Sequence, residues 1–560
     1  MKKRALSPII AFAVVLILAV TAQAQQGWTV YGGDPGNTRY STLTQINPGN
    51  VKNLKVAWVL QLGSLRSQES TPLVIGDTLY VTSSHGPKNV FAVEAKTGVV
   101  RWRYSPDVPA GIDQYACCDV NNRGVAYSNG RVFVGRLDGA LVALDAATGK
   151  EVWKTQVVDY TQGSVITSPP TIAKNLVVTG FGGGEYGARG YIVAYDQADG
   201  KEVWRFYTVP GPGEAGNETW KGDSWKTGGV SVWITGSYDP QLNLAYWGTG
   251  NAAQWMGDQR PGDNLYSASV IALDADTGKL RAHHQYHWND SWDWDEVSAP
   301  ILMDVQRGGR TIKSLVHPAR NGYLWVLERR ADAITFVDAK PYVKQTVFTK
   351  LDPRTGRPEY DETKKPVTGK KVGFCPSLWG GKDWPPAAYN PKTGYLYIPA
   401  NENLCGSLLG AQQPYEPGKL WLGTEIKDIG MAVAAGTNHI GEIQAWNMNT
   451  GQKVWTRTFE SHNWGPVLTT GSGLVFAGGT NDRYFRAFDG RTGEPVWQWR
   501  TNSGITGVPS SFAVDGVQYV AVQSGWGVDA QRMQNSLDDI RGAKTDVPQG
   551  GVIWVFAVKQ

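Results

Sequence analysis

Short runs of apolar residues recur along the chain, and turn residues separate them from one another. Val132-Phe133-Val134 and Leu141-Val142-Ala143-Leu144 are two examples. Apolar runs of this length, bounded by turn signals, predict β-strands that bury at least one face. We therefore expect an all-β fold.

The strands belong to a repeat in which Ala-x-Asp or a close variant ends one strand, Thr-Gly or Asp-Gly forms a turn, and Trp ends the next strand. Gly permits the positive φ of a tight hairpin, and Asp or Thr can bond the turn backbone. We expect the periodic Trp to pack between neighbouring repeats. The strong copies are residues 92–102, 143–153, 194–204, 445–455 and 487–497, and the weaker copies are 272–282, which lacks the Trp, and the turn 390–394.

The spacing of the repeats indicates the architecture. The first three strong copies are 51 residues apart, and the last two are 42 apart. Repeats of about 40 to 50 residues with several short strands indicate propeller blades. Seven turns, and a strand at 552–558 that completes a blade begun near Ala57 and Trp58, predict an eight-bladed β-propeller. Insertions at 210–225, 255–266 and 352–371 are expected at blade ends, where binding sites collect.

The N-terminus has the features of an export signal. A basic start is followed by an apolar run from Ile9 to Val20 and a small-residue exit at Ala22 and Ala24. This pattern predicts a signal peptide at residues 1–24 and a single mature domain at 25–560. A membrane anchor is the alternative, but the run is short for a bilayer. No later stretch predicts a membrane span.

The charge of the mature chain excludes one class of partner. The full sequence carries a formal net charge of +4, and residues 1–24 hold three basic and no acidic side chains, which leaves +1. Nucleic-acid-binding domains usually present a basic stripe or a pI above about 9. We therefore expect no nucleic-acid partner.

Four cysteines in an exported chain suggest disulfides. Cys375 and Cys405 are expected to form a stabilising bridge. Cys117 and Cys118 are adjacent, with Cα atoms about 3.8 Å apart. A bond at that spacing would be strained and therefore of the kind that is more often functional than structural. Two buried thiols are the alternative at this point.

Three segments depart from the repeat. Residues 180–190 are rich in glycine and hold Glu185, residues 246–251 end at Asn251, and residues 289–296 hold Asp293 and Asp295. Glycines let a flat ligand approach the backbone, although a flexible hairpin has the same composition. Carboxylates and an amide oxygen are ligands of hard cations. Because alternate residues of a strand share a side, Asp293 and Asp295 are expected to face one ion, the alternative being solvated turns.

These segments resemble the periplasmic pyrroloquinoline quinone (PQQ)-dependent methanol and ethanol dehydrogenases. The resemblance covers essentially the whole mature chain. It rests on the vicinal cysteines followed by Arg123, on the Gly-Glu-Tyr-Gly segment around Glu185, and on the Trp-Asp pair ending at Asp293. It implies an enzyme that oxidises small primary alcohols to aldehydes in the periplasm. No CxxCH haem sequence occurs, so a separate cytochrome c is the expected electron acceptor.

The resemblance assigns roles to individual residues. Cys117 and Cys118 would form a disulfide on one face of the quinone, and Trp233 would stack on the other face. Asp293 would be the catalytic base, and Arg320 would stabilise developing negative charge. Asp383 stands near where the family often has Asn, which weakens the assignment of a contact there. The remaining cofactor neighbours would be Glu69, Arg123, Thr167, Gly183, Gly184, Arg320 and Trp464, and the metal ligands would be Glu185, Asn251, Asp293 and Asp295.

The resemblance also indicates which metal is used. Family members that use lanthanides have a second Asp two residues after the base, and this chain has Asp295. A lanthanide ion is therefore expected, with calcium as the alternative. Two other functions share the repeat, namely a sugar-oxidising quinoprotein and a non-catalytic propeller scaffold for protein assembly. The sequence leaves the preferred alcohol and the oligomeric state open, a homodimer being one candidate.

Overall fold

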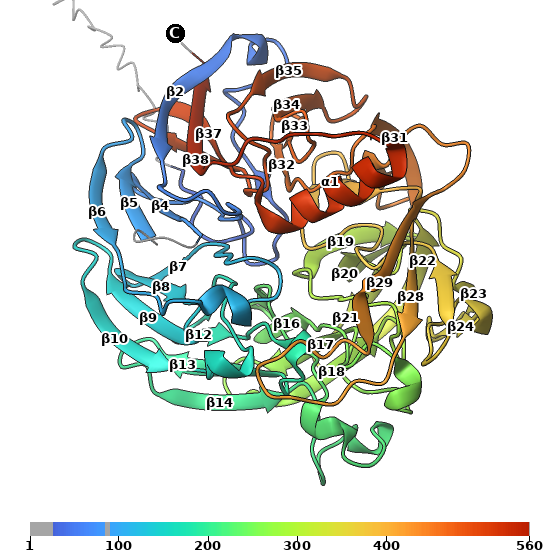
Figure 1. The fold of residues 1–560 in the computed structure, drawn as a ribbon. Coiled ribbons are helices and arrows are strands. Elements are labelled where there is room, and N and C mark those ends of the chain that lie inside the picture. Colours follow the sequence, from blue (N-terminus) through green and yellow to red (C-terminus); the bar gives the residue numbers. More distant parts are fainter. Residues whose placement is uncertain (1–25, 85–89, 559–560) are drawn as a thin grey trace, which may run out of the picture.

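The computed structural model describes residues 26–84 and 90–558. The predicted signal peptide at 1–24 lies outside the described residues. Figure 1 shows short β-sheets arranged as a ring around a common centre, so the predicted all-β propeller fold is confirmed. Within the described part of the chain, no helix is long and apolar enough to cross a membrane.

Five four-stranded sheets follow one another along the chain, and each is an antiparallel meander of consecutive strands. They are β3 (Leu73–Ile75), β4 (Thr78–Thr82), β5 (Val90–Glu94) and β6 (Val100–Tyr104); β7 (Ala126–Ser128), β8 (Arg131–Gly135), β9 (Ala140–Asp145) and β10 (Glu151–Gln156); β11 (Thr171–Ala173), β12 (Leu176–Thr179), β13 (Tyr191–Asp196) and β14 (Glu202–Tyr207); β15 (Ser237–Asp239), β16 (Leu244–Gly248), β17 (Ser269–Asp274) and β18 (Leu280–Gln285); and β19 (Ile301–Arg307), β20 (Arg310–Pro318), β21 (Tyr323–Arg329) and β22 (Ile334–Pro341).

Three further sheets of four or five strands also lie in the ring, and two of them include strands from the N-terminal part of the chain. β2 pairs with β38 from Leu54↔Val558 to Gln61↔Val552, as the sequence predicted, so both ends of the described chain share one sheet. This pairing closes the ring. The sheets are β26 (Ala388–Asn390), β27 (Tyr395–Asn401), β30 (Gly441–Asn447) and β31 (Gln452–Phe459); β1 (Tyr40–Ser41), β32 (Val467–Thr470), β33 (Leu474–Ala477), β34 (Tyr484–Asp489) and β35 (Pro495–Arg500); and β36 (Ser510–Val514), β37 (Val517–Ser524), β38 (Val552–Val558) and β2 (Leu54–Gln61).

Smaller elements lie between these sheets. The Cys375–Cys405 disulfide is present, and it links the end of β25 to β28. The short strands are β23 (Phe348–Leu351), β24 (Pro358–Tyr360), β25 (Lys371–Phe374), β28 (Leu404–Gly410) and β29 (Thr424–Val433). The helices are α1 (Gly527–Arg541) and the 3-10 turns η1 (Val51–Asn53), η2 (Ile112–Tyr115), η3 (Tyr160–Gln162), η4 (Gly184–Tyr186), η5 (Asn217–Thr219), η6 (Ser224–Thr227), η7 (Gly257–Gln259) and η8 (Glu362–Lys364).

The repeat tryptophans connect neighbouring sheets, which confirms their predicted role. Trp102 at the end of one repeat donates its indole N–H to the Ala146 carbonyl of the next sheet at 3.0 Å, and its ring covers Gly149 in the turn there. Trp497 donates to Leu54 O and so joins the last repeat to β2. The same indole-to-carbonyl bond is made by Trp58 to Ala95, Trp153 to Gln197, Trp204 to Ala275 and Trp455 to Gly490.

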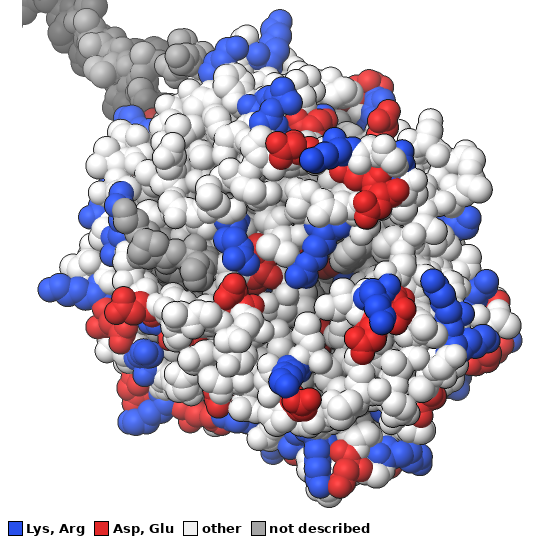
Figure 2. All heavy atoms as spheres, in the orientation of Figure 1, with Lys and Arg blue, Asp and Glu red and all other residues white. Residues whose placement is uncertain are grey.

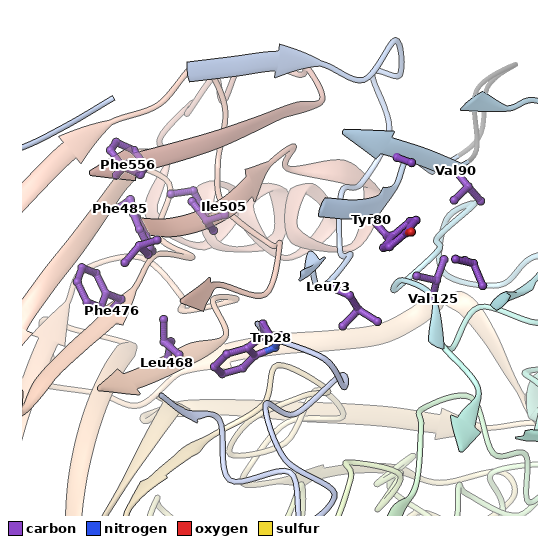
Figure 3. Packing of buried hydrophobic residues seen from close by; sticks show 14 of the residues in the cluster. Trp28, Leu73, Tyr80, Val90, Val125, Leu468, Phe476, Phe485, Ile505 and Phe556 are labelled. Carbon is purple, nitrogen blue, oxygen red and sulfur yellow. The ribbon is translucent and has the colours of Figure 1, made fainter. Parts of the chain in front are cut away.

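The hydrophobic core lies between the sheets. One cluster spans the junction between the first and last parts of the chain and includes Trp28, Tyr80, Phe476, Phe485 and Phe556. Figure 3 shows these side chains coming from segments that are far apart in sequence. The N-terminal segment therefore helps to hold the closed ring together.

The helix α1 lies across the face of the ring that Figure 1 presents. Its end is marked by Gly542 in the left-handed conformation, a common C-terminal cap. Most of this face is uncharged, with acidic and basic side chains scattered over it and a hollow near the middle in Figure 2. The candidate site opens beneath α1 and β29.

Packing against tryptophan can be tested with two glycines of one sheet. Gly149 and Gly130 have φ of +72° and +74°, but a Cβ at Gly149 would lie 2.5 Å from Trp102 whereas one at Gly130 would meet nothing within 4 Å. Gly149→Ala should therefore lower the free energy of unfolding by about 1 to 3 kcal/mol more than Gly130→Ala. Urea unfolding of both variants measures this difference. If both variants lost the same free energy of unfolding, the Trp102 ring would not be packed tightly against Gly149.

Candidate active site

A cavity of about 500 Å³ gathers most of the residues predicted from sequence. Glu69, Gly184, Asn251 and Trp464 are outside its lining. Of these, Glu69 pairs with Arg123, and Trp464 is buried in a cluster that includes Trp384 and Trp526. The predicted residues that line the cavity are Cys117, Cys118, Arg123, Thr167, Gly183, Glu185, Trp233, Asp293, Asp295, Arg320 and Asp383.

Three carboxylates meet in this cavity. One ligand atom each from Glu185, Asp293 and Asp295 lie within 4.8 Å of one another. Glu185 comes from η4, whereas Asp293 and Asp295 come from a segment without regular secondary structure. The expectation that they lie on a strand is wrong, because Asp293 has a φ of 63°.

The two aspartates nevertheless reach the same space. Trp292 and Trp294 between them are fully buried and stack with ring centroids 5.0 Å apart. Packing these rings into the core leaves Asp293 and Asp295 facing the cavity. Side chains of this segment therefore alternate between core and cavity although the segment is not part of a β-sheet.

Arg320 balances the negative charge of the three carboxylates only in part. Burial, together with the neighbouring carboxylates, raises the pKa of Asp293 well above its usual range even though Arg320 opposes the shift. Burial likewise raises the pKa of Asp295 to about 7 and raises that of Glu185. Buried carboxylates of this kind need a cation or a proton. Their oxygen donor set fits a hard cation.

Asn251 lies against the cluster. Its backbone N–H donates to Asp295 Oδ1 at 2.6 Å. With its amide nitrogen toward Asp295, the side chain would donate to the same oxygen at 3.0 Å and accept from Trp255. Turning the amide oxygen toward the carboxylates instead requires a cation between them, because two acceptors repel. Asn251 is thus placed to become a ligand when a cation is present.

Arg320 is held from three directions. Its guanidinium contacts Asp295 Oδ2 at 3.0 Å and Asp383 Oδ2 at 2.7 Å. Its backbone N–H donates to Glu296, whose carboxylate also bonds the His317 ring at 2.7 Å. These carboxylates raise the pKa of Arg320 despite its burial, so it remains a fixed positive charge. Sequence reasoning missed Glu296, although it directly follows Asp295.

The vicinal cysteines and Trp233 line the same cavity. The structure joins Cys117 to Cys118 in a disulfide. Asp119, the next residue, accepts hydrogen bonds from Ser67 N at 3.2 Å and Val528 N at 3.1 Å, and so ties this turn to the start of α1. Trp233 donates its indole N–H to Asp295 at 3.1 Å. Sequence reasoning also missed Asp119, whose tie to α1 depends on Val528, 409 positions away.

Arg123 supplies a second buried cation. It pairs with Glu69 at 2.7 Å and donates to Thr167 Oγ1 at 2.9 Å. The Nε–H groups of Arg123 and Arg320 are buried without a hydrogen-bond partner among the described residues. Two unsatisfied guanidinium donors beside a disulfide and an indole suit a planar ligand with several acidic oxygens.

Comparison with known proteins gives a consistent result. The family described as PQQ: Glucose/ethanol/alcohol dehydrogenase, beta-propeller domain matches residues 28–347 and 428–520. A lanthanide-dependent methanol dehydrogenase of Methylacidiphilum fumariolicum is 40% identical over 525 residues, which span 89% of this chain and 85% of that protein. The quinoprotein alcohol dehydrogenase PedH of Pseudomonas putida is 38% identical over 546 residues, 92% of this chain and 89% of that protein.

The solved structures agree with the sequence relatives. A europium-containing methanol dehydrogenase superposes with a TM-score of 0.88 at 37% sequence identity. The match covers 95% of this chain and 98% of that chain.

The carboxylate cluster predicts that a trivalent cation stabilises the metal-free protein. At a concentration of about one hundred times Kd, La³⁺ should add about 2.7 kcal/mol to the free energy of unfolding. Thermal unfolding with and without La³⁺ measures this gain, and Glu185→Gln should reduce it. Asp529→Asn is the control, because Asp529 lines the same cavity outside the cluster. An unfolding midpoint that does not respond to La³⁺ would contradict the assignment.

Proposed function

The chain belongs to the PQQ-dependent glucose, ethanol and alcohol dehydrogenase family of β-propellers, and from this premise we propose that it is a periplasmic, lanthanide-using alcohol dehydrogenase. It oxidises primary alcohols to aldehydes. The observation that carries this proposal is the meeting of Glu185, Asp293 and Asp295 beside Arg320. As a member of this family the protein is an oxidoreductase, so the non-catalytic scaffold is set aside.

The cavity fits both non-protein groups of the proposed reaction. Cys117, Cys118 and Trp233 would pack against PQQ, with Arg123 and Arg320 donating to its oxygens and Glu69, Thr167, Gly183, Gly184, Asp383 and Trp464 around them. The metal ion would be held by Glu185, Asn251, Asp293 and Asp295. When bound, PQQ supplies the two-electron oxidant that takes a hydride from the alcohol carbon, and the metal supplies Lewis acidity.

Side chains of the protein would accept the proton of the alcohol and stabilise the negative charge that develops in the reaction. Asp293 accepts the hydroxyl proton of the alcohol at a carboxylate oxygen, as a general base does. Arg320, held by Asp295 and Asp383, keeps a fixed guanidinium beside the developing negative charge. Burial of the cluster excludes bulk water, which strengthens both effects.

A lanthanide is favoured over calcium by charge. Three carboxylates and one amide oxygen match the charge of a trivalent ion, and the relative from Methylacidiphilum fumariolicum is named as lanthanide-dependent. The named relatives also favour alcohols over sugars as substrates. Calcium remains the alternative ion, and a sugar-oxidising quinoprotein the alternative function.

The remaining parts of the proposal concern the whole molecule. The five meander sheets and the three further sheets are the eight blades of one domain at residues 25–560. The signal peptide at 1–24 directs it to the periplasm. A separate cytochrome c takes the electrons. A homodimer is the candidate oligomer.

Replacing the proposed base tests the mechanism. Asp293→Asn should lower kcat by at least about a hundredfold, because the amide cannot accept the hydroxyl proton. Turnover with an artificial electron acceptor measures this change, and stabilisation by La³⁺ checks that the variant still binds metal. Asp529→Asn is the matched control within the cavity. Near-normal turnover of Asp293→Asn would place the base elsewhere.

The metal preference has its own test. Metal-free enzyme given PQQ and La³⁺ should be far more active than the same enzyme given Ca²⁺, and Asp295→Ala should erase that difference. Asp383→Asn is the control, because it removes the other carboxylate on Arg320 and leaves the cluster intact. Its lanthanide preference should persist. Equal or better activity of the unmodified enzyme with Ca²⁺ would refute the lanthanide assignment and leave the alcohol dehydrogenase assignment standing.

A further inference from the structure

One wall of the cavity comes from a segment that the proposed mechanism does not use. Residues 411–433, called the strap here, connect β28 to the end of β29. In Figure 1 the orange chain before β29 crosses the face of the ring. The strap residues that line the cavity are Leu420, Leu422, Ile426, Ile429 and Met431.

The strap is fixed to the metal-binding loop. Trp421 N donates to the Glu185 carbonyl at 2.7 Å, and Trp255 N donates to the Leu422 carbonyl at 3.0 Å. Tyr415 and Trp421 pack edge to face and close over Gly187. The apolar wall is therefore held in a set position relative to the carboxylates.

The wall is apolar where it meets solvent. Leu420 is 43% exposed and Ile426 is 68% exposed, among the large hydrophobic side chains left open to water. A single exposed apolar residue needs no explanation. Here five apolar residues of one segment line the same cavity as Asp293. Leu378 and Trp379 add two more apolar side chains to its lining.

The helix α1 contributes polar side chains to the lining. They are Asp529, Arg532, Asn535 and Ser536. Asp293 and the apolar side chains of the strap line the same cavity, so an alcohol with its hydroxyl at Asp293 could place a carbon chain against the strap. Methanol has no carbon chain beyond its carbinol carbon to place there.

We propose that the strap selects primary alcohols with an apolar chain or ring over methanol. This inference rests on the proposed function and names its substrate class. Each methylene that the strap removes from water should raise kcat/KM about fourfold. The increase in kcat/KM should end once the carbon chain of the alcohol is as long as the apolar surface of the strap.

The first test uses the holoenzyme and a series of methanol, 1-butanol and 1-hexanol. We expect kcat/KM to rise along the series. Leu420→Ser/Ile426→Ser should lower the ratio of kcat/KM for 1-hexanol to that for methanol by at least about tenfold. The control is Val152→Ser/Val203→Ser, which changes two valines that are 45% and 49% exposed on the edge strands β10 and β14 and are not among the cavity-lining residues. Its ratio should stay unchanged.

A second readout does not depend on turnover. The tertiary alcohol 2-methyl-2-hexanol carries no hydrogen on its carbinol carbon and cannot be oxidised to an aldehyde. Saturation-transfer NMR should show its terminal methyl contacting the holoenzyme and the control variant. The signal should be lost in Leu420→Ser/Ile426→Ser. tert-Butanol, which has no chain, should show little transfer in any of them.

The outcomes separate the two claims. If the holoenzyme oxidises no alcohol, the proposed function fails, whatever the NMR shows. If it oxidises methanol as well as 1-hexanol, or if the strap variant keeps the original ratio, the function stands and the role of the strap is overturned. Equal saturation transfer in the strap variant and its control would overturn it as well.

Discussion

One contact repeated around the ring underlies the rest of the structure: an indole of one repeat lies on the turn glycine of the next sheet and donates its N–H to a carbonyl there. Each contact combines a partly or fully buried aromatic ring with a hydrogen bond worth about 1 kcal/mol net. The glycine is required because a Cβ would strike the ring, as at Gly149 and Gly200. Residues 272–282 lack the Trp, so that repeat offers no indole to the sheet that follows.

The closed ring allows the site to be built from irregular backbone. Glu185 stands in a 3-10 turn, and Asp293 adopts a positive φ. Such conformations persist only when the surroundings hold them. Here Trp292 and Trp294 are packed into the core, and Glu296 holds the Arg320 backbone against the same cluster. Packing around the cavity therefore stabilises a fold that holds an excess of buried carboxylates.

Arg123 and Arg320 give the cavity a charged part, and the strap gives it an apolar part. Arg123 and Arg320 each pair with carboxylates, and each keeps a buried N–H that finds no partner in the described part of the chain. The strap presents aliphatic side chains to the same space and is tied by its backbone to Glu185. A hydroxyl and a hydrocarbon chain can thus be recognised by different walls of one cavity.

The repeat was enough to determine much of this protein from sequence alone. Apolar runs, Thr-Gly turns and periodic Trp predicted the propeller, because these signals are local and recur. They also predicted that a strand at 552–558 completes a blade begun near Ala57 and Trp58. Glu185, Asp293 and Asp295 were found because they interrupt the repeat. Their convergence, the clamp of Asp119 on α1, the support of Glu296 and the apolar strap were decided only by the tertiary structure. Each of these joins residues from loops far apart in the chain, and no local periodicity reports where such loops meet.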